Sequence, residues 1–484
     1  MRIICLFIRA ILDIFSKLKK LLTHFNKMQT NIAKLIKGQD VFFKSGLSLP
    51  ITTRKQLLKA LRDTIINRED VILKAIYKDL KKPAFEALAT ELNLVIAEIN
   101  NTLKHIDKWS RPRRVSSSIL NFPSKAKIYP EPYGRVLIIS PWNYPFALAM
   151  MPLIGAVAAG NTAVLKPSEL SPNTTEIIAE IIQDIFPRDH VAVVVGDQQI
   201  AQNLLGFRWD YIFFTGSTQV GKYVCQKAAE HLTPVTLELG GKSPCIVDST
   251  ASFKHLAKRI VWGKFLNAGQ SCIAPDYILV SYQVKDQLVA ALKEEIIKIF
   301  HVQNDSNSDY TQIINDAHKE RLLNILEGQD ILYGGTVNGR YFAPTLVDEP
   351  HIDSPLMQQE IFGPILPIIG FHSFEQVKEM IDRHEKPLAL YVFSTKKSFI
   401  DKVLETFSFG GGVVNDTMVH YAEKNLPFGG VGHSGMGAYH GALTFKTFSH
   451  QKSVVQRNRW LDIPLRYPPY KQKAKWLKLI QRYL

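Results

Sequence analysis

An apolar run that ends in a glycine-rich turn stands near the middle of the chain and reads Tyr211-Ile-Phe-Phe-Thr-Gly216-Ser-Thr-Gln-Val-Gly221-Lys222-Tyr223. The pattern predicts a buried strand, a tight turn and a helix start, which together present backbone N–H groups to a phosphate. The spacing from Gly216 to Lys222 matches a P-loop, but Tyr223 stands where the magnesium-binding hydroxyl is required. The dinucleotide fingerprint G-x-G-x-x-G also fails, because Ser217 and Thr218 fill its middle. A nucleotide site and a plain strand-to-helix turn therefore both stay open.

Similar short apolar runs recur on both sides of this turn, each followed by glycine, proline or the start of a helix. They are Arg135–Ile139, Thr162–Leu165, Val191–Val195, Tyr211–Phe214, Val235–Leu237, Cys245–Val247 and Tyr277–Val280. Alternating strands and helices are typical of parallel sheets covered by helices on both faces. The sequence thus predicts an α/β fold with two such blocks, divided near residue 235, after a helical region from residue 52 to about 109.

The composition is that of a globular protein: 484 residues, 46% of them hydrophobic and 21% charged. These values exclude collagen-like and disordered chains. The four cysteines, Cys5, Cys225, Cys245 and Cys272, are too few and too scattered for a disulfide framework, and none shows zinc-binding spacing. We therefore expect a cytoplasmic protein that is not secreted and has no metal centre.

The net charge of +15 is concentrated at the two ends of the chain. Residues 1–27 carry +5 and residues 451–484 carry +8, which leaves +2 for the rest. A nearly neutral body argues against a nucleic-acid enzyme. Residues 1–27 and 471–484 also show an amphipathic helical pattern, which is typical of segments that lie on anionic membrane surfaces. The alternatives are helices docked on the body and, for residues 1–27, a leader before a true start at Met28.

The uncharged stretch from Val136 to Leu165 is long enough to be tested as a membrane span. Prolines and glycines interrupt it repeatedly, at Pro141, Pro145, Pro152, Gly155 and Gly160. The stretch is better interpreted as a buried strand, a proline-rich turn, a core helix and a second buried strand.

Two residues have the character of catalytic groups. Glu238 ends an apolar strand beside a Gly-Gly turn, where burial raises the pKa of a carboxylate and suits it to general-base catalysis. Cys272 is surrounded by small residues that leave its sulfur accessible to a substrate. Taken singly, each also fits a structural role, such as a core cysteine or a carboxylate bound to turn amides.

A set of motifs in a fixed order resembles the aldehyde dehydrogenase family from about Met28 to residue 470. The motifs are Pro141-Trp-Asn143-Tyr-Pro-Phe, Lys166-Pro-Ser-Glu169, Gly216 to Gly221, Leu237-Glu238-Leu-Gly-Gly-Lys, Gly269-Gln-Ser-Cys272, Glu360-Ile-Phe362-Gly-Pro and Pro427-Phe-Gly-Gly. Further details, including Ser434-Gly-Met-Gly-Ala-Tyr-His-Gly, look like the class 3, fatty-aldehyde branch.

The resemblance implies a role for each motif in the oxidation of apolar aldehydes to acids. Cys272 would be the nucleophile, Asn143 would bind the oxyanion, and Glu238 would activate water, with Glu360 as a second candidate base. NAD, or NADP, would be held by Lys166 and Glu169 at the adenosine ribose and by Glu360 and Phe362 at the nicotinamide ribose. The pyrophosphate would lie against Gly216, Ser217, Thr218, Gln219, Val220 and Gly221. Tyr144, His420 and Tyr421 would line the substrate entrance.

The resemblance also implies the domain organisation and the oligomer. We expect a Rossmann-like NAD-binding domain at 28–234 with a bridging segment at about 119–135, a catalytic domain at 235–430 and an oligomerisation segment at 431–460. A homodimer is expected, flanked by basic ends at 1–27 and 461–484 that contact an anionic membrane. The alternatives, a P-loop nucleotide hydrolase built on Gly216–Lys222 and a non-catalytic relative, fit the ensemble of motifs less well.

Overall fold

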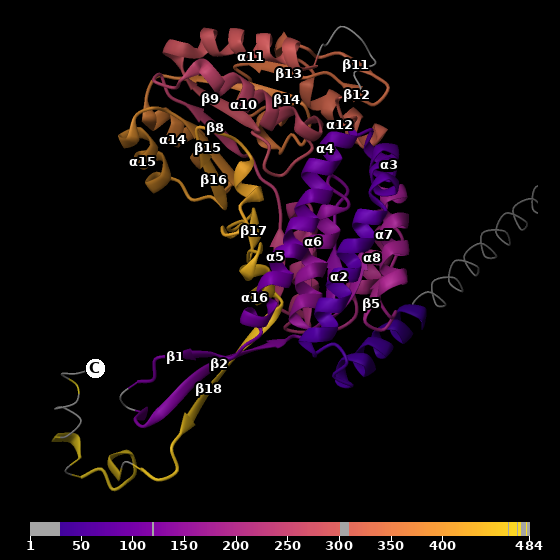
Figure 1. The fold of residues 1–484 in the computed structure, drawn as a ribbon. Helices are drawn as coiled ribbons and strands as arrows, with labels where there is room; N and C mark the ends of the chain where they lie inside the picture. The colour runs from indigo at the N-terminus through magenta and orange to yellow at the C-terminus, as the bar shows by residue number, and fades with distance from the viewer. Residues whose placement is uncertain are drawn as a thin grey trace, which may run out of the picture.

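The computed structural model describes residues 30–118, 121–300, 309–462, 464–471, 473–475 and 481. The helix predicted for residues 1–27 lies outside these ranges, and so does most of the one predicted for 471–484. The described residues form two mostly parallel sheets, a three-stranded antiparallel sheet and a two-stranded hairpin (Figure 1). The predicted α/β fold is therefore confirmed.

The predicted N-terminal helical region is confirmed and is divided into several helices. A helix over residues 30–44 precedes α2 (Ile51–Asn67), α3 (Glu69–Leu80), α4 (Ala84–Ala87), a π-helical turn (Leu88–Leu92) and α5 (Asn93–Trp109). Between α3 and α4 the chain turns sharply, because Lys81 adopts a left-handed conformation and Pro83 directly precedes α4. This turn brings Lys82 into the interior, where it is fully buried.

The first sheet has six strands and helices on both faces. In spatial order the strands are β17 (Gly435–Met436), β7 (Val235–Glu238), β6 (Tyr211–Thr215), β3 (Arg135–Ile139), β4 (Thr162–Lys166) and β5 (Val191–Val193). All neighbours are parallel except β17 and β7. Alternate residues such as Ile138 pack toward α2, α5, α6 (Ala147–Ala159) and α7 (Pro172–Ile185). Residues such as Leu137 pack toward helix 30–44, α8 (Gln198–Leu205) and α9 (Thr218–Ala229).

The second sheet has seven strands: β10 (Asp330–Tyr333), β13 (Thr345–Asp348), β14 (Ile365–Phe371), β9 (Tyr277–Ser281), β8 (Pro244–Val247), β15 (Ala389–Phe393) and β16 (Gly411–Val414). Its apolar side chains pack on one face with α10 (Phe253–Phe265), α11 (Lys285–Phe300) and α12 (Asp316–Leu326), in a core that continues into the first sheet. The other face packs with α14 (Phe374–Asp382) and α15 (Lys397–Thr406). Hairpin β11 (Val337–Asn338) and β12 (Tyr341–Phe342) and helix α13 (Pro355–Gln358) complete this region. The predicted strands are confirmed in both sheets, with Val191–Val195 ending at Val193.

The chain crosses between the two sheets over residues 239–243, and a buried ion pair holds this crossing. Lys242 Nζ lies 2.5 Å from Asp276 Oδ2, and both side chains are almost fully buried. The same ammonium donates to the carbonyl oxygens of Leu356 and Gln359, at 2.9 and 3.1 Å. Asp276 Oδ1 accepts from the N–H of Ile361 at 2.9 Å. One pair therefore joins the crossing, the start of β9 and the segment around residue 360.

The stretch from Val136 to Leu165 forms β3, a turn, α6 and β4, as predicted. All thirteen residues of α6 are buried, so its apolar character reflects a place in the protein core. In the part of the chain that the structure describes, no helix combines the length and the apolar composition needed to cross a bilayer.

A narrow antiparallel sheet projects away from the two larger sheets (Figure 1). It consists of β1 (Arg113–Val115), β2 (Ser124–Pro132) and β18 (Ser449–Arg457), with β2 and β18 paired from Ser124 opposite Arg457 to Pro132 opposite Ser449. We call this sheet the arm. Helix α16 (Ala442–Thr447) precedes β18. At the base of the arm, the buried Asn161 side chain accepts from the N–H of Gly134 and donates to the carbonyl of Phe448, which ties both ends of the arm to the body.

Candidate active site

Cys272 follows a turn of unusual backbone geometry at the end of α10. The short 3-10 segment Leu266–Gly269 contains Asn267 and Ala268 at φ values of 54° and 51°, and Gly269 follows at 71°. Left-handed backbone costs a residue with a side chain about 1–2 kcal/mol. A Cβ at Gly269 would lie 2.3 Å from the carbonyl oxygen of Gly363, so only glycine fits there. The turn ends just before Cys272, so the groups that hold the turn also direct the thiol.

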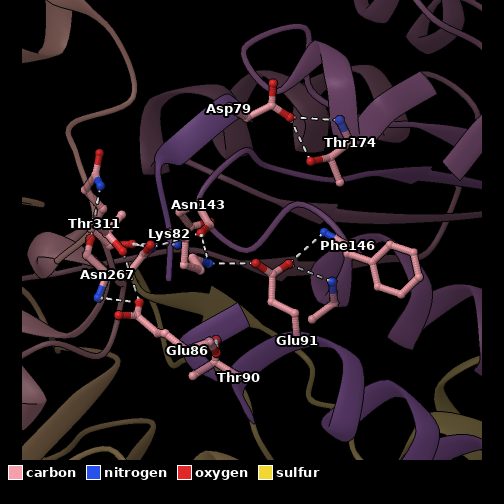
Figure 2. Close-up of polar contacts among 12 residues, drawn as sticks. Asp79, Lys82, Glu86, Thr90, Glu91, Asn143, Phe146, Thr174, Asn267 and Thr311 are labelled. Carbon is pink, nitrogen blue, oxygen red and sulfur yellow. Dashed lines mark hydrogen bonds and ion pairs between the residues drawn. The ribbon is translucent and has the colours of Figure 1, made fainter. Parts of the chain in front are cut away.

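The carboxylate of Glu86 and the side chain of Asn267 hold this turn (Figure 2). Glu86 Oε1 accepts from the N–H of Asn267 at 2.8 Å and from the hydroxyl of Thr311 at 3.3 Å. Asn267 Nδ2 donates to the carbonyl oxygens of Asn143 and Gln270, at 2.9 and 3.0 Å. Burial raises the pKa of Glu86 to about 7. The cysteine loop and the loop that carries Asn143 are thus bonded to each other directly.

Cys272 and Glu238 lie where two cavities meet. The first cavity, of about 270 Å³, is lined by Pro141, Trp142, Asn143, Leu148, Thr215, Gly216, Ser217, Glu238, Leu239, Gly240, Cys272, His318, Arg321, Glu360 and Phe362. The second, of about 260 Å³, is lined by Ala89, Thr90, Leu94, Tyr144, Leu148, Thr215, Glu238, Trp262, Leu266, Ser271, Cys272, Ile273, Met418, Val419, Tyr421, Ala422, Phe428 and Tyr439. The first cavity contains charged side chains besides Glu238, whereas the second is mainly apolar and aromatic.

Glu238 is the last residue of β7 and is 3% exposed. No described residue donates a hydrogen bond to either oxygen of its carboxyl group. Burial without a partner disfavours the charged form, and it raises the pKa of Glu238 well above its usual range. The predicted environment of this residue is therefore present: an isolated carboxyl group at the wall shared by both cavities.

Glu360 lines the first cavity and lies close to the crossing between the sheets. Its carboxylate lies against Gly240, where an added Cβ would be 2.2 Å from Oε2. Burial, and then the nearby Asp276, raise the pKa of Glu360 to about 8. Burial, and then Glu360 and Glu238, raise the pKa of the Cys272 thiol well above its usual range. The site therefore favours the protonated thiol when these carboxylates are ionised.

Asn143 brings an amide group to the same place. Its side chain is 3% exposed and lines the first cavity. Nδ2 donates to the carbonyl oxygen of Gln270 at 3.1 Å. An amide nitrogen carries two hydrogens, so a second N–H is left for a ligand in the cavity. The structure thus brings together Cys272, Glu238, Asn143, Glu360 and Phe362, which the motifs singled out.

The residues predicted to hold a nucleotide lie along the carboxyl edge of the first sheet, where parallel sheets bind ligands. Gly216 and Ser217 line the first cavity, and the Ser217 hydroxyl caps α9 by accepting from the N–H of Val220 at 3.4 Å. Gln219 and Val220 are exposed on the first turn of α9, whereas Thr218 donates to the carbonyl of His433 and Gly221 is buried.

Lys166 ends β4 and pairs with Glu169 at 2.5 Å, outside the lining of the first cavity. Lys222, the lysine of the P-loop alternative, is exposed and lines neither of these cavities.

The three expected wall residues differ in their placement. Tyr144 lines the second cavity, and so do Tyr421 and Tyr439, whose hydroxyl oxygens lie 3.4 Å apart. His420 is buried beside Tyr391 and Phe428 and lies outside that lining. The next residue, Tyr421, does line the cavity, because neighbouring residues of the 3-10 turn Val419–Ala422 face different directions.

Two residues that support Glu360 and Phe362, His318 and Arg321, were not predicted from the sequence. His318 Nε2 lies 2.8 Å from the carbonyl oxygen of Phe362, and the Arg321 guanidinium donates to the carbonyl of Ile361. Burial, and then Arg321, lower the pKa of His318 to about 4, so His318 is neutral and donates this bond. Both residues come from α12, whose sequence is that of an ordinary amphipathic helix. No signal in the sequence distinguishes them from solvent-facing residues.

Comparison with known proteins identifies the family. The sequence model of the aldehyde dehydrogenase family matches residues 19–454. The chain belongs to the aldehyde dehydrogenase family. The resemblance that the motifs predicted is therefore confirmed, and the chain is an oxidoreductase of that family.

Similar proteins place this aldehyde dehydrogenase near the class 3 branch, as predicted. It is 46% identical to 4,4'-diaponeurosporen-aldehyde dehydrogenase of Staphylococcus aureus, over 90% of this chain and 96% of that protein. Aldehyde dehydrogenase family 3 member A2 of Mus musculus is 44% identical (90% and 91%), and the dimeric NADP-preferring aldehyde dehydrogenase of Canis lupus familiaris is 42% identical (91% and 98%). The solved structure of the substrate-bound state of Staphylococcus aureus AldH superposes with a TM-score of 0.91 at 44% identity, over 93% of this chain and 99% of that one.

The environment of the thiol predicts how Cys272 reacts with an alkylating reagent. Because the thiolate is the reactive form and the pKa of Cys272 is raised, iodoacetamide modification should accelerate about tenfold per pH unit up to about pH 9. Glu360→Gln removes a negative charge, lowers the thiol pKa and should increase the rate at pH 8. Peptide mass spectrometry separates Cys272 from the other cysteines.

The matched control for this experiment is Asp79→Asn. Asp79 is a buried carboxylate outside the lining of both cavities, and its replacement should leave the alkylation rate unchanged. A rate that reaches its plateau below about pH 8 in the unmodified protein would show that the thiol pKa is not raised.

Proposed function

We propose that this aldehyde dehydrogenase converts apolar aldehydes, medium- or long-chain aliphatic or aromatic, to carboxylates, with NAD or NADP as hydride acceptor. The observation that carries the proposal is the position of Cys272 and Glu238 on the wall shared by two cavities. A substrate bonded to Cys272 reaches an apolar cavity on one side and a cavity with charged groups on the other. An apolar chain suits the former, and a dinucleotide suits the latter.

In this proposal, the thiol of Cys272 gives up its proton to solvent water, Sγ bonds to the carbonyl carbon, and the carbonyl oxygen becomes an oxyanion. The second N–H of Asn143 Nδ2 and the backbone N–H of Cys272 donate to that oxygen, a contribution of about 3–4 kcal/mol per donor in comparable sites. Bound nicotinamide supplies the acceptor for the hydride that leaves the same carbon, and a thioester remains on Cys272. Glu238 then takes a proton from water, the oxygen adds to the thioester carbon, and the thiolate of Cys272 leaves.

The first cavity fits a dinucleotide at several points. The N–H groups at the start of α9, beside Gly216 and Ser217, form a site for phosphate. Glu360 Oε1 has no hydrogen-bond partner among the described residues, which suits a carboxylate that binds ribose hydroxyls. We assign Lys166 and Glu169 to the second ribose. We assign the first sheet to the NAD-binding domain, which the sequence predicted at 28–234, and the second sheet to the catalytic domain, predicted at 235–430. Because β7 (Val235–Glu238) belongs to the first sheet, we place the boundary in the crossing at 239–243. A carboxylate at Glu169 repels a 2′-phosphate and favours NAD.

Two variants test the catalytic assignments separately. Cys272→Ala should abolish turnover, because no adduct forms, while NAD binding measured by protein fluorescence stays unchanged. Glu238→Gln should keep a burst of about one NADH per site and reduce the steady-state rate about 100-fold, because only the hydrolysis step needs the base. Stopped-flow absorbance at the NADH band measures both. A Cys272→Ala enzyme that turns over would overturn the proposal.

A series of aldehydes tests the substrate class. With substrates from about two to sixteen carbons, kcat/KM should rise about fourfold per methylene until the second cavity is filled, since each buried methylene contributes about 0.8 kcal/mol. Benzaldehyde should also be oxidised. Run in parallel with NADP, the series tests the role of Glu169, and Glu169→Gln should improve the use of NADP. If kcat/KM does not change with chain length, the apolar substrate class is wrong. If kcat/KM is equal with NAD and NADP, the role of Glu169 is wrong.

We also propose that the arm joins two copies in a homodimer and that the basic ends hold the enzyme on membranes from the cytoplasmic side. Seven consecutive residues of β18, from 450 to 456, are exposed, so the arm offers a surface for a second copy. Beyond β18, the large aromatic side chains of Trp460, Tyr467 and Tyr470 are exposed next to Arg459 and Arg466. Aromatic and cationic side chains in this combination suit an anionic lipid surface.

Flotation with liposomes tests the membrane assignment. The full chain should float with vesicles that contain phosphatidylserine and stay in the aqueous fraction with phosphatidylcholine alone, because the attraction is electrostatic. A chain of residues 28–470 should lose most of the recovery while its oxidation of a soluble aldehyde is unchanged. Equal recovery of the two chains with the vesicles would show that the charged ends do not bind the membrane.

A further inference from the structure

Lys82 and Glu91 form an ion pair in the interior, beneath the loop that carries Asn143 (Figure 2). Lys82 Nζ lies 2.6 Å from Glu91 Oε1, and both side chains are completely buried. Lys82 comes from the sharp turn between α3 and α4, and Glu91 comes from the π-helical turn Leu88–Leu92. Single π-helical turns within α-helices are frequent at functional sites.

Each member of the pair makes further bonds to the loop. Lys82 Nζ donates to the carbonyl oxygen of Asn143 at 3.1 Å and lies 4.2 Å from the centre of the Tyr144 ring. Glu91 Oε2 accepts from the N–H groups of Phe146 and Ala147, at 2.9 and 3.3 Å. The pair therefore holds the backbone at the start and at the end of the loop 143–147.

The bonds of Glu91 replace a cap that the sequence of α6 does not provide. The residue before α6 is Phe146, whose side chain offers no acceptor for the first N–H groups of the helix. A carboxylate at a helix N-terminus supplies that acceptor and interacts favourably with the helix dipole. The position of α6, and with it the end of the Asn143 loop, thus depends on a charge whose partner is Lys82.

We propose that Lys82 and Glu91 are positioning residues for Asn143, and that they hold its amide where it stabilises the oxyanion. The proposal rests on the proposed oxyanion role of Asn143 and adds two residues to it. Asn143 is fixed at both ends: its carbonyl oxygen accepts from Lys82 and Asn267, and its side chain donates to Gln270. Without the ammonium, the carbonyl loses one of these two donors, and the buried carboxylate loses the only cationic partner that it has among the described residues.

A contribution to stability alone explains the pair poorly. Buried ion pairs contribute little net stability compared with apolar residues of similar volume, since both charges lose their hydration. Orientation, in contrast, has a large effect on rate, because a misplacement of about 1 Å in a catalytic group costs about 100-fold. The pair fixes orientation at the loop that carries the oxyanion donor.

The chain contains a matched case that is not bonded to the Asn143 loop. Asp79 is a buried carboxylate that caps α7, accepting from the N–H groups of Asn173 and Thr174 at 3.1 and 2.8 Å. Figure 2 shows its contacts with Thr174. Like Glu91, it holds the start of a helix that packs on the first sheet. Its bonds do not reach the Asn143 loop. Asp79→Asn therefore separates the loss of a buried cap from the loss of a positioned amide.

The test is a double-mutant cycle in the full enzyme with Lys82→Met and Asn143→Ala. Asn143→Ala should lower kcat about 100-fold or more. Lys82→Met should lower kcat about 10-fold or more while the KM for aldehyde and the NAD affinity change less than about threefold. The two together should be no slower than Asn143→Ala alone within about threefold, because a misplaced amide and a missing amide lose the same interaction.

Glu91→Gln extends the test in a variant that keeps an oxygen for the N–H groups of α6. It should give a smaller loss of kcat than Lys82→Met, and its loss should likewise not multiply with that of Asn143→Ala. If Lys82→Met does not fold, the cycle of Glu91→Gln with Asn143→Ala tests the proposal by itself. Asp79→Asn should lower the thermal midpoint of unfolding by about as much as Glu91→Gln does, but its kcat should stay within about twofold of that of the parent enzyme.

The outcomes separate the two proposals. If Asn143→Ala leaves kcat unchanged, the oxyanion assignment fails and the positioning role fails with it. If Asn143→Ala is slow but the losses multiply in the double variant, the oxyanion assignment stands and the positioning role is overturned. A folded Lys82→Met enzyme with the parent kcat also overturns it.

Discussion

The buried ion pair between Lys242 and Asp276 is the constraint on which the active site depends. Lys242 lies in the crossing that follows Glu238, and Asp276 lies in the segment that follows Cys272. Through the carbonyl of Gln359 and the N–H of Ile361, the same pair holds the backbone on both sides of Glu360. Three segments that are distant in the sequence are thus anchored at one point, and each of them delivers one ionisable group to the first cavity. The same contacts therefore fix both the relative placement of the two sheets and the relative placement of these three groups.

The electrostatic character of the site follows from this arrangement. Cys272, Glu238 and Glu360 each carry negative charge when ionised, and burial raises the pKa of all three groups. The local balance therefore favours neutral forms, and negative charge is tolerated only where donors are fixed in advance. The amide of Asn143 is such a donor, which gives the residues that fix it a large effect on rate. The same balance explains why charged side chains serve as internal supports here, as Lys82 with Glu91 and Lys242 with Asp276.

Local patterns in the sequence were sufficient for the strands and the fold class. For the site they gave only candidates: Glu238 as a carboxylate at the end of an apolar strand, and Cys272 as a cysteine among small residues. The ordered motifs of the family resemblance were needed to favour a catalytic role for both over a structural one. The supporting residues follow no such rule. Lys82, Glu86 and Glu91 lie in a charged helical region, and the same pattern describes a solvated helix surface. Only the sharp turn after α3 and the packing of the loop 143–147 bury them, and both are consequences of tertiary structure. His318 and Arg321 carry no sequence signal for the same reason. Of the two neighbours predicted for the cavity wall, Tyr421 lines the cavity and His420 does not.

The pairing of β2 with β18 has a consequence for how such enzymes diversify. Because Arg457 lies opposite Ser124, the chain leaves the folded core at the end of the arm and away from both sheets. None of the described residues after Arg457 lines either cavity. The C-terminal segment can therefore change in evolution, and with it the location of the enzyme in the cell. Such a change needs no compensating change in the active site.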